Sequence, residues 1–239
     1  MTLFVGLGYL SLLLWGLNRH DDRFANEFLC QPRPWLVAPW NMPTDTQVKN
    51  LWVDVTRDAE GILRCVPRGD GGPLPLKPGA PTLREFARKF SAHAREKFLL
   101  VSVLANLENI DQQVSRELAA EWDERVLIQS EFEPVLAQLK ILRPLFAFGT
   151  SAADRVRWLS YSSVGLLPAV SFSRDVYVTP LRLNGHQAVT ASLIREIHRR
   201  QKKILLGPLA TPAEIDEAHQ LDPDGYFVTN DQALKALQD

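Results

Sequence analysis

One carboxylate stands inside an otherwise apolar run of the sequence. The run is LWVDV, residues 51–55, and its acid is Asp54. The longer stretch LWVDVTRDAEGILRCVP predicts two β-strands joined by a polar turn. A buried carboxylate in a strand is costly unless it binds a metal ion or pairs with a cation. Asp54 is therefore the first candidate for a functional site, as a metal ligand or as one half of an ion pair.

Other polar residues come at the ends of later apolar runs. They are Ser130, Glu131, Thr150 and His186. If these runs are the strands of a parallel barrel, such residues gather at its C-terminal face, where barrel enzymes keep their active sites. No acid or nucleophile lies beside His186 in the sequence, so we interpret it as a solvated loop residue.

The composition excludes several classes of protein. The 239 residues include 46% hydrophobic residues, enough to bury a sizeable core. The formal net charge is -1 and no basic stripe is interleaved with aromatic residues, so nucleic acid is not expected as a partner. Cys30 and Cys65 lie far apart, without the spacing of a zinc site or a disulfide framework, and are interpreted as buried or half-buried thiols.

Eight short apolar runs alternate with amphipathic stretches from Trp35 onward. The runs are WLVAPW, LWVDV, FLLVSVLA, RVLIQS, LFAFGT, DVYVTPL, KILLGPL and GYFVTN. The stretches between them repeat apolar residues at intervals of three and four, as amphipathic helices do. Strands and helices in strict alternation predict parallel pairing, and eight such units close into an α/β (β/α)8 barrel. An open doubly wound sheet is the alternative.

Two segments depart from this regular pattern. Only NMPTDTQVKN separates the first two runs, too short a connection for a full crossover helix, so the first helix is expected to be reduced or missing. The stretch RGDGGPLPLKPGAP, residues 68–81, is rich in Gly and Pro and predicts a surface loop.

The first residues differ from the rest of the chain. MTLFVGLGYLSLLLWGL carries no charge and has Trp15 near its end, which predicts a retained transmembrane anchor over residues 1–18. A buried helix is the alternative. A juxtamembrane linker, residues 19–34, and the barrel, residues 35–239, would follow. Arg19 and Arg23 come after the span and nothing basic precedes it, which places the barrel of this single-pass protein in the cytoplasm.

In their order and spacing these runs resemble the glycerophosphodiester phosphodiesterase family, whose fold is a (β/α)8 barrel. PTLREFARKF resembles the start of a family helix, and RVLIQSEFEPVLAQLKILRP is similar to the family's fourth strand and helix. DPDGYFVTNDQALKAL resembles its closing strand and helix. The resemblance covers about residues 35–238 and implies the same scaffold.

Most positions that carry catalysis in that family differ here. The family's first strand ends in Ala-His-Arg-Gly, and residues 38–41 read Ala-Pro-Trp-Asn, so Trp40 and Asn41 replace charged or small groups. Its metal-binding Pro-Glu-Asn-Thr turn resembles residues 43–46, Pro-Thr-Asp-Thr, where the glutamate is absent.

The remaining family positions are similarly altered. A Glu-x-Asp pair of metal ligands matches Trp52 and Asp54, so one ligand remains. The family's His-Asp pair, which supplies the general acid, matches Pro67 and Arg68. A Glu-x-Lys motif expected at the third strand is absent from residues 99–106. Asp54 alone cannot hold a hard cation, so the resemblance predicts a remnant carboxylate that pairs with a cation such as Arg57 or is hydrogen-bonded in the barrel mouth.

We therefore expect a membrane-anchored, catalytically inactive barrel that binds or scaffolds within a membrane assembly. The expected partners are the lipid bilayer, through residues 1–18, and a membrane protein, and no cofactor is expected. One alternative is a metal-dependent hydrolase of glycerophosphodiesters, which would need Ca²⁺ or Mg²⁺. Another is a sensor that binds a phospholipid headgroup without cleaving it. Large apolar groups at Trp40 and Trp52 predict a mouth closed by side chains or covered by residues 68–81.

Overall fold

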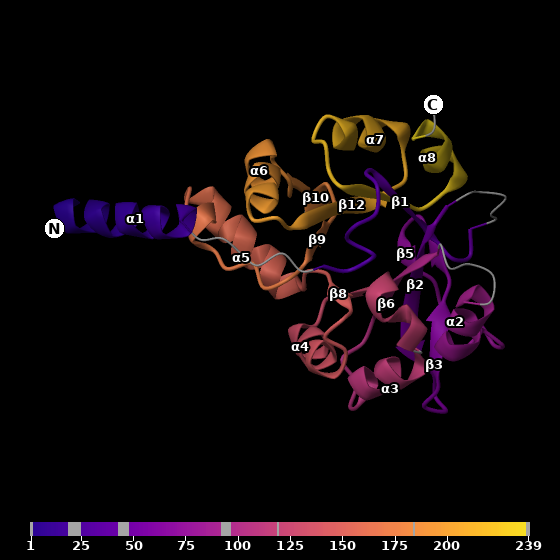
Figure 1. Cartoon of the computed structure of the whole chain (residues 1–239). Helices are drawn as coiled ribbons and strands as arrows, with labels where there is room; N and C mark the ends of the chain where they lie inside the picture. The colour runs from indigo at the N-terminus through magenta and orange to yellow at the C-terminus, as the bar shows by residue number, and fades with distance from the viewer. Residues whose placement is uncertain are drawn as a thin grey trace.

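A computed structural model of the chain describes residues 2–18, 25–42, 48–91, 97–118, 120–183 and 185–237. These residues form a parallel β-barrel surrounded by helices, with one further helix projecting from it (Figure 1). Some residues that were interpreted above lie outside this description. They are the 43–46 turn, part of the 19–34 linker with Arg19 and Arg23, and the residues at the two ends of the sequence.

All eight predicted barrel strands are present. They are β1 (Trp35–Pro39), β2 (Asn50–Arg57), β6 (Phe98–Val103), β7 (Val126–Ser130), β8 (Ala147–Phe148), β9 (Val176–Thr179), β12 (Lys203–Leu209) and β13 (Gly225–Val228). Apart from β8 and β9, each of these strands pairs in parallel with the next one along the chain, and β1 also pairs in parallel with β13. The first strand therefore lies beside the last, which is the order of a barrel and not of an open doubly wound sheet. The predicted hairpin is also confirmed, because β3 (Leu63–Val66) pairs antiparallel with β2.

The barrel closes between β8 and β9 through a seam of mixed hydrogen bonds. The backbone amide of Asp175 donates to the Phe148 carbonyl at 2.9 Å, and the Phe148 amide donates to the Asp175 carboxylate at 3.0 Å. Further along, the Thr150 hydroxyl donates to the Val178 carbonyl at 2.9 Å and accepts from the Val178 amide at 3.1 Å. A side chain therefore replaces a strand residue in the ladder at this point.

Helices cover the outside of the barrel where the sequence predicts them. They are α2 (Leu83–Ser91), α3 (Ile110–Glu117), α4 (Glu133–Leu142), α5 (Ala152–Ser163), α6 (Ala191–Arg199), α7 (Pro212–His219) and α8 (Asp231–Ala236), with the short turns η1 (Ala120–Arg125) and η2 (Leu167–Ala169). Thr211 and Glu214 form a capping box at the start of α7, as their spacing indicates. Between β1 and β2 no helix is present in residues 40–42 and 48–49, the part of this connection that the structure describes.

The barrel interior is filled at the end where the strands begin. Phe28 is fully buried there and packs edge-on against Trp35 and Phe98. Its amide donates to the Glu124 carbonyl at 2.9 Å, which attaches the segment before β1 to the barrel wall. Phe28 therefore closes the barrel interior at this end, and the pocket lined by Trp52 and Phe227 lies at the opposite end, where the strands finish.

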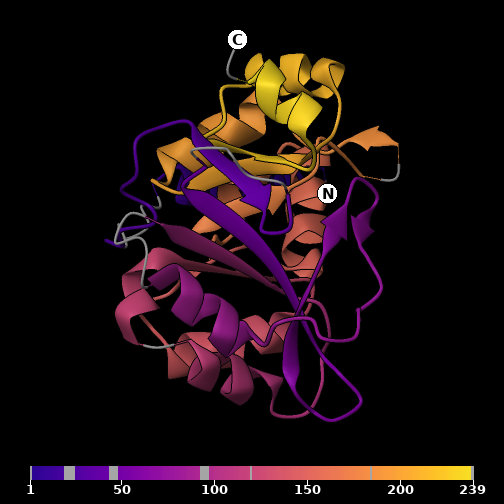
Figure 2. The same ribbon diagram turned by 90° about the vertical axis from the view of Figure 1, so that its right-hand side faces the viewer.

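Two short hairpins stand at this C-terminal end, which we call the mouth. They are β4–β5 (Arg68–Gly69 and Gly72–Pro73) and β10–β11 (Arg182–Leu183 and His186–Gln187). In Figure 2 the purple β4–β5 hairpin and the orange β10–β11 hairpin extend on the same side of the molecule. The predicted loop of residues 68–81 thus begins as a hairpin over the mouth.

Helix α1 (Thr2–Leu17) projects from the barrel, and its middle and last turns contact the body, where the Tyr9 hydroxyl donates to the Val164 carbonyl at 3.2 Å (Figure 1). Gly16 packs so closely on the η2 backbone that an added Cβ would lie 2.2 Å from the Pro168 carbonyl oxygen. The predicted transmembrane span is not found, since no helix in the described ranges combines the length and the apolar content that crossing a bilayer requires. Over residues 7–17, whose side chains the structure describes, α1 nevertheless exposes large apolar groups, with Leu10 at 52%, Leu14 at 53% and Trp15 at 57% exposure.

We expect Thr150→Val to destabilise the fold by about 1–3 kcal/mol, because it leaves the amide and the carbonyl of Val178 buried without partners. Chemical denaturation of the purified protein measures the difference. Thr150→Ser is the matched control, because it keeps the hydroxyl and should retain most of the stability. Equal losses in the two variants would contradict a hydrogen-bonded seam.

Candidate functional site

Asp54 is 1% exposed, and its carboxylate is held by a cation. The guanidinium of Arg68 donates from Nε to Oδ2 at 2.6 Å and from Nη2 to Oδ1 at 2.9 Å. The indole Nε1 of Trp52 donates to Oδ1 at 2.8 Å. The expected ion pair is therefore present, but its cation is Arg68 and not Arg57. Arg57 points elsewhere and binds the Gln113 side chain and the Glu108 carbonyl.

Aromatic rings surround this ion pair. Trp52 on β2 stacks on Phe227 from β13, with ring centroids 4.0 Å apart and planes 13° apart. The Arg68 guanidinium lies 5.1 Å from the Trp52 ring centroid and 5.4 Å from that of Phe227. Cation–π contacts of this kind strengthen when water is excluded. The arginine charge is therefore satisfied by one carboxylate and two rings.

The backbone of the β4–β5 hairpin is fixed so that Arg68 points into the barrel. The Asn41 side chain accepts from the Arg68 amide and donates to the Arg68 carbonyl, both at 2.9 Å. The Asn230 side chain donates to the carboxylate of Asp70 at 3.0 Å, which attaches the turn of the hairpin to the end of β13. Asn41, a predicted mouth residue, thus positions the arginine instead of touching a ligand.

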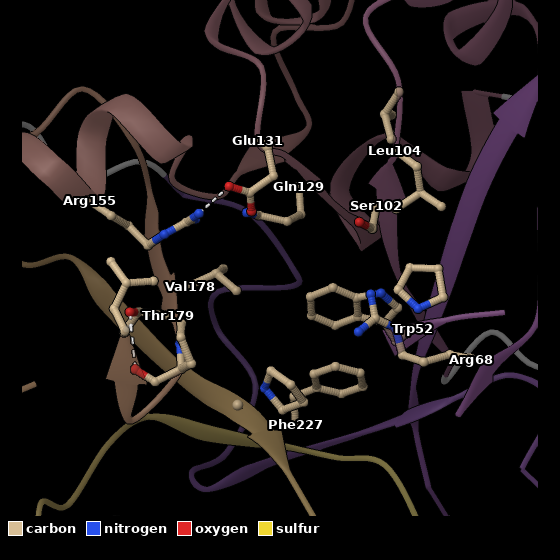
Figure 3. Close-up of a pocket in the computed structure, with 16 residues that line it drawn as sticks. Trp52, Arg68, Ser102, Leu104, Gln129, Glu131, Arg155, Val178, Thr179 and Phe227 are labelled. Carbon is tan, nitrogen blue, oxygen red and sulfur yellow. Dashed lines mark hydrogen bonds and ion pairs between the residues drawn. The ribbon is translucent and has the colours of Figure 1, made fainter. Parts of the chain in front are cut away.

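A pocket of about 430 Å³ remains beside the ion pair (Figure 3). One wall is made by Trp52, Arg68 and Phe227, and the opposite wall by Glu131 and Arg155. Pro73 and Leu183 from the two hairpins line its entrance side. The predicted closed mouth is therefore only half correct: aromatic and arginine side chains fill one side, and a cavity remains on the other.

The second wall carries polar atoms without partners. Arg155 pairs with Glu131 and donates from Nη1 to the Thr150 carbonyl at 3.2 Å. Gln129 on β7 donates to the same carbonyl at 2.8 Å. Arg155 Nε and Gln129 Oε1 are buried and have no hydrogen-bond partner within the ranges described. Such groups are costly unless a ligand or water meets them.

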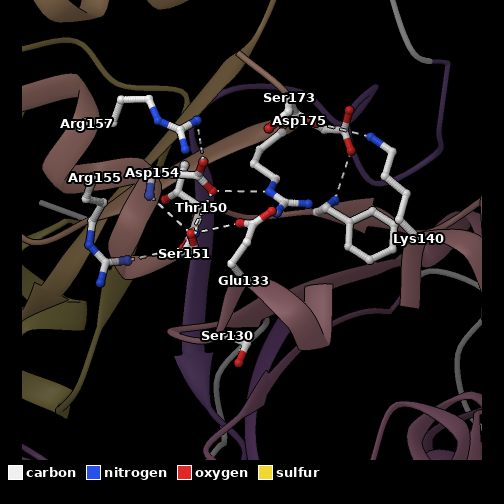
Figure 4. A network of polar contacts seen from close by, with 12 residues as sticks. Ser130, Glu133, Lys140, Thr150, Ser151, Asp154, Arg155, Arg157, Ser173 and Asp175 are labelled. Atoms are coloured by element: carbon white, nitrogen blue, oxygen red, sulfur yellow. Dashed lines mark hydrogen bonds and ion pairs between the residues drawn. The ribbon is translucent and has the colours of Figure 1, made fainter. Parts of the chain in front are cut away.

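A network of ion pairs outside the barrel holds the helix that carries Arg155 (Figure 4). Ser151 and Asp154 form a capping box at the start of α5, and the Ser151 hydroxyl also donates to Glu133 of α4 at 3.1 Å. Arg174 joins Asp154 at 3.2 Å and pairs with Glu133. Because these groups link α4, α5 and the start of β9, the first turn of α5 is held against the pocket.

The other predicted site residues lie apart from the pocket. Trp40 packs on Phe86 of α2 and donates to the Val66 carbonyl at 3.1 Å, so it fills the outer layer. The Ser130 hydroxyl donates to the Val103 carbonyl at 2.9 Å and is a strand contact. Thr150 forms the seam, and His186 is exposed on β11. Of the predicted residues, Trp52 and Glu131 line the cavity, and Asp54 supports its wall.

Sequence reasoning did not select Gln129, Arg155 or Phe227. Gln129 had a usable signal, since it is a polar residue inside the apolar run RVLIQS, as Asp54 is in LWVDV. Arg155 and Phe227 had none, because an arginine in a first helical turn and a phenylalanine in a strand are ordinary residues there. The strand register shows which residues of β6 lie beside the Asp54 position. Leu100 pairs with Trp52 and Ser102 pairs with Asp54, so this strand supplies no second carboxylate there.

The described residues bring together no group of three or more His, Cys, Asp or Glu side chains that could hold a metal ion. Cys65 is not suited to act as a nucleophile, because burial raises the pKa of its thiol to about 12. Cys30 is exposed, against the expectation of a buried thiol.

Solved structures share this architecture. The chain is similar to a glycerophosphoryl diester phosphodiesterase from Silicibacter pomeroyi, with a TM-score of 0.60 and 13% identity over 95% of this chain and 97% of that one. A glycerophosphoryl diester phosphodiesterase domain from Mycobacterium tuberculosis gives a TM-score of 0.63 and 14% identity over 86% of this chain and 98% of that one. The fold is that of the glycerophosphodiester phosphodiesterases.

An Oleispira antarctica phosphodiesterase, solved with its product sn-glycerol-3-phosphate, is similar with a TM-score of 0.60 and 14% identity, over 86% of this chain and 97% of that one. At such identities the similarity establishes the phosphodiesterase fold alone. No family model and no curated protein matches the sequence. The fold predicted from the resemblance is confirmed, and activity has to be argued from the site.

We expect Asp54→Leu to destabilise the protein by about 3–5 kcal/mol, because it leaves the Arg68 guanidinium buried without a counter-charge. The double variant Asp54→Leu/Arg68→Met should recover most of that loss, since it removes both charges together. Denaturation of the wild type, the two single variants and the double variant gives the coupling energy. A coupling energy near zero would mean that the pair does not organise the mouth.

Proposed function

We propose that this chain is a membrane-attached, non-hydrolytic barrel of the phosphodiesterase fold that acts as a binding or scaffolding subunit of a membrane assembly. The observation that carries the proposal is the Asp54–Arg68 ion pair. The Arg68 guanidinium binds the carboxylate that the resemblance assigns to a metal ion, through two hydrogen bonds of 2.6 and 2.9 Å. A divalent cation would have to displace the Arg68 guanidinium, which is always charged. The Arg68 side chain is 10% exposed, and Asn41 holds the hairpin that carries it.

The chemistry of phosphodiester hydrolysis supports the same proposal. Cleavage of this type uses a cation to neutralise developing charge, a base, and an acid on the leaving oxygen. Among the described residues, those lining the pocket include one carboxylate, Glu131, which is paired with Arg155, and no histidine. A general acid or base contributes roughly 10²- to 10⁴-fold each, so a site with this lining would be very slow.

Membrane attachment is proposed from the surface of α1. A helix that is apolar on all sides belongs in a protein core or in lipid, yet Leu10, Leu14 and Trp15 are each more than half exposed. Lipid is the favoured cover because a basic residue of α6, Arg199, contacts the end of this helix. Cytoplasmic location of the barrel remains a proposal that depends on Arg19 and Arg23.

A second candidate function is a sensor that binds a phosphorylated headgroup in the mouth. The unpartnered Arg155 Nε and Gln129 Oε1 beside a 430 Å³ cavity favour it. It differs from scaffolding in one observable: sn-glycerol 3-phosphate would raise the melting temperature, and Arg155→Gln would remove the rise.

We expect the purified chain to show no hydrolysis of glycerophosphodiesters above background with added Ca²⁺, Mg²⁺ or Mn²⁺, because the Asp54 carboxylate is paired with Arg68. Release of glycerol phosphate is the measurement, with the Oleispira antarctica phosphodiesterase assayed in parallel as a positive control. Metal-dependent turnover that disappears in Asp54→Asn would establish the hydrolase alternative instead.

We expect the full chain to float with phosphatidylcholine vesicles in a density gradient, and Leu10→Glu to weaken this binding at least about tenfold, because a charge is placed in the apolar surface. Ile141→Glu is the matched control, since Ile141 is 73% exposed on α4. If the wild type instead remained soluble as a stable oligomer, α1 would be covered by protein and the lipid proposal would fail.

A further inference from the structure

A second pocket lies at the opposite end of the barrel from the mouth, where β12 and β13 begin. Its volume is about 440 Å³. The residues that line it are Arg33, His198, Gln201, Lys202, Lys203 and Asp224. Four of these six side chains can carry a positive charge and one is an acid, so the lining is mainly cationic.

Asp224, the one acid among the described lining residues, is paired with several donors. Asp224 is 1% exposed and accepts hydrogen bonds from His198 Nε2 at 2.9 Å, Lys203 Nζ at 3.0 Å and the Ile204 amide at 2.9 Å. Arg33 Nε lies 3.1 Å from the same carboxylate. Burial alone would raise the pKa of Asp224, but the hydrogen bonds from His198, Ile204 and Lys203 outweigh it and hold the pKa below its usual value. One buried negative charge thus gathers three basic side chains.

Lys202 has no equivalent partner. Its side chain is 11% exposed, and among the residues that the structure describes its nearest acid is Asp175, with Nζ 3.9 Å from Oδ1. That separation exceeds a hydrogen bond. Burial also raises the pKa of Asp175 above its usual value. Asp222 is the other acid near the pocket, but its side chain is 90% exposed and lies 3.5 Å from Arg33. The ammonium group of Lys202 therefore lines the pocket with unused donors.

The last turn of α6 carries both a residue of the pocket, His198, and a residue that contacts α1, Arg199. Arg199, next to His198 on α6, donates to the Gly16 carbonyl at 3.1 Å and to the Leu17 carbonyl at 3.0 Å, the last residues of α1. The end of α6 thus contributes His198 to the basic pocket and contacts the last residues of α1, whose preceding turn exposes Leu14 and Trp15. A molecule that reaches both surfaces needs an anionic group and an apolar chain, and phospholipids combine the two.

We propose that this basic pocket binds the phosphate group of an anionic phospholipid, an inference that rests on the membrane attachment proposed above. Lys202 supplies ammonium donors to the phosphate oxygens, and the positive charges of Lys203 and Arg33, which Asp224 holds at the same pocket, add to the attraction. The acyl chains lie beside α1. Attachment then depends on lipid charge as well as on apolar burial, and the barrel end that carries the basic pocket faces the membrane surface.

The test compares binding of the full chain to two kinds of vesicle, phosphatidylcholine alone and phosphatidylcholine with phosphatidylglycerol. The wild type should bind the anionic vesicles more tightly. Lys202→Glu should weaken binding to anionic vesicles by about 30-fold, from roughly fivefold for each unit of charge removed near an anionic surface. Lys77→Glu makes the same charge change on the exposed loop at the mouth and should leave binding unchanged. Melting temperatures confirm that both variants fold.

The possible outcomes separate the proposals. Equal binding of the wild type to both vesicles, or equal weakening by the two variants, overturns the headgroup site while leaving attachment through α1 intact. Absence of binding to either vesicle overturns the attachment itself, and this inference with it. If inorganic phosphate raises the melting temperature of the wild type but not of Lys202→Glu, while the vesicles are not distinguished, the pocket takes free phosphate and the lipid assignment is wrong.

Discussion

Asp54 lies in the wall of the barrel with 1% of its surface exposed, and its charge is tolerated there because the Arg68 guanidinium meets it with two hydrogen bonds. The rest of the mouth follows from this pair. The β4–β5 hairpin must approach closely enough for the arginine to reach, and Asn41 fixes its backbone. Trp52 and Phe227 must stack beside the guanidinium to exclude water. The shape of the remaining cavity is what these groups leave open.

The two ends of the barrel serve different purposes in the function we propose. At the mouth, an internal cation occupies the acid that a metal ion would need. At the other end, Phe28 plugs the barrel interior, while Arg33, Lys202 and Lys203 surround a second pocket beside α1. A barrel attached through the second end would present its mouth hairpins to other molecules. Such a division fits a subunit whose surface, and not its catalysis, is its working part.

The sequence predicted the scaffold well because its signals are local. Eight apolar runs and the stretches between them mark strands and helices through periodicity alone, and a capping box marks the start of α7. The partner of Asp54 was harder to predict. Arg57 is nearer in sequence, but it lies three residues along the same strand, on the opposite face, whereas Arg68 reaches the carboxylate from a hairpin. Thr150 was predicted as a mouth residue from its position after a strand. Its hydroxyl instead helps close the barrel by bonding to Val178 on β9, 28 residues away in the sequence.

The central claim is that Arg68 takes the place of a metal ion at Asp54, and titration of the purified chain with Mn²⁺ tests it most directly. Electron paramagnetic resonance follows the free aqueous ion, whose signal falls when the ion binds to protein. We expect the signal to be unchanged by the wild type up to about 1 mM Mn²⁺, because one arginine-paired carboxylate cannot compete with water for the ion. Saturable binding by the wild type that is lost in Asp54→Asn would contradict the claim.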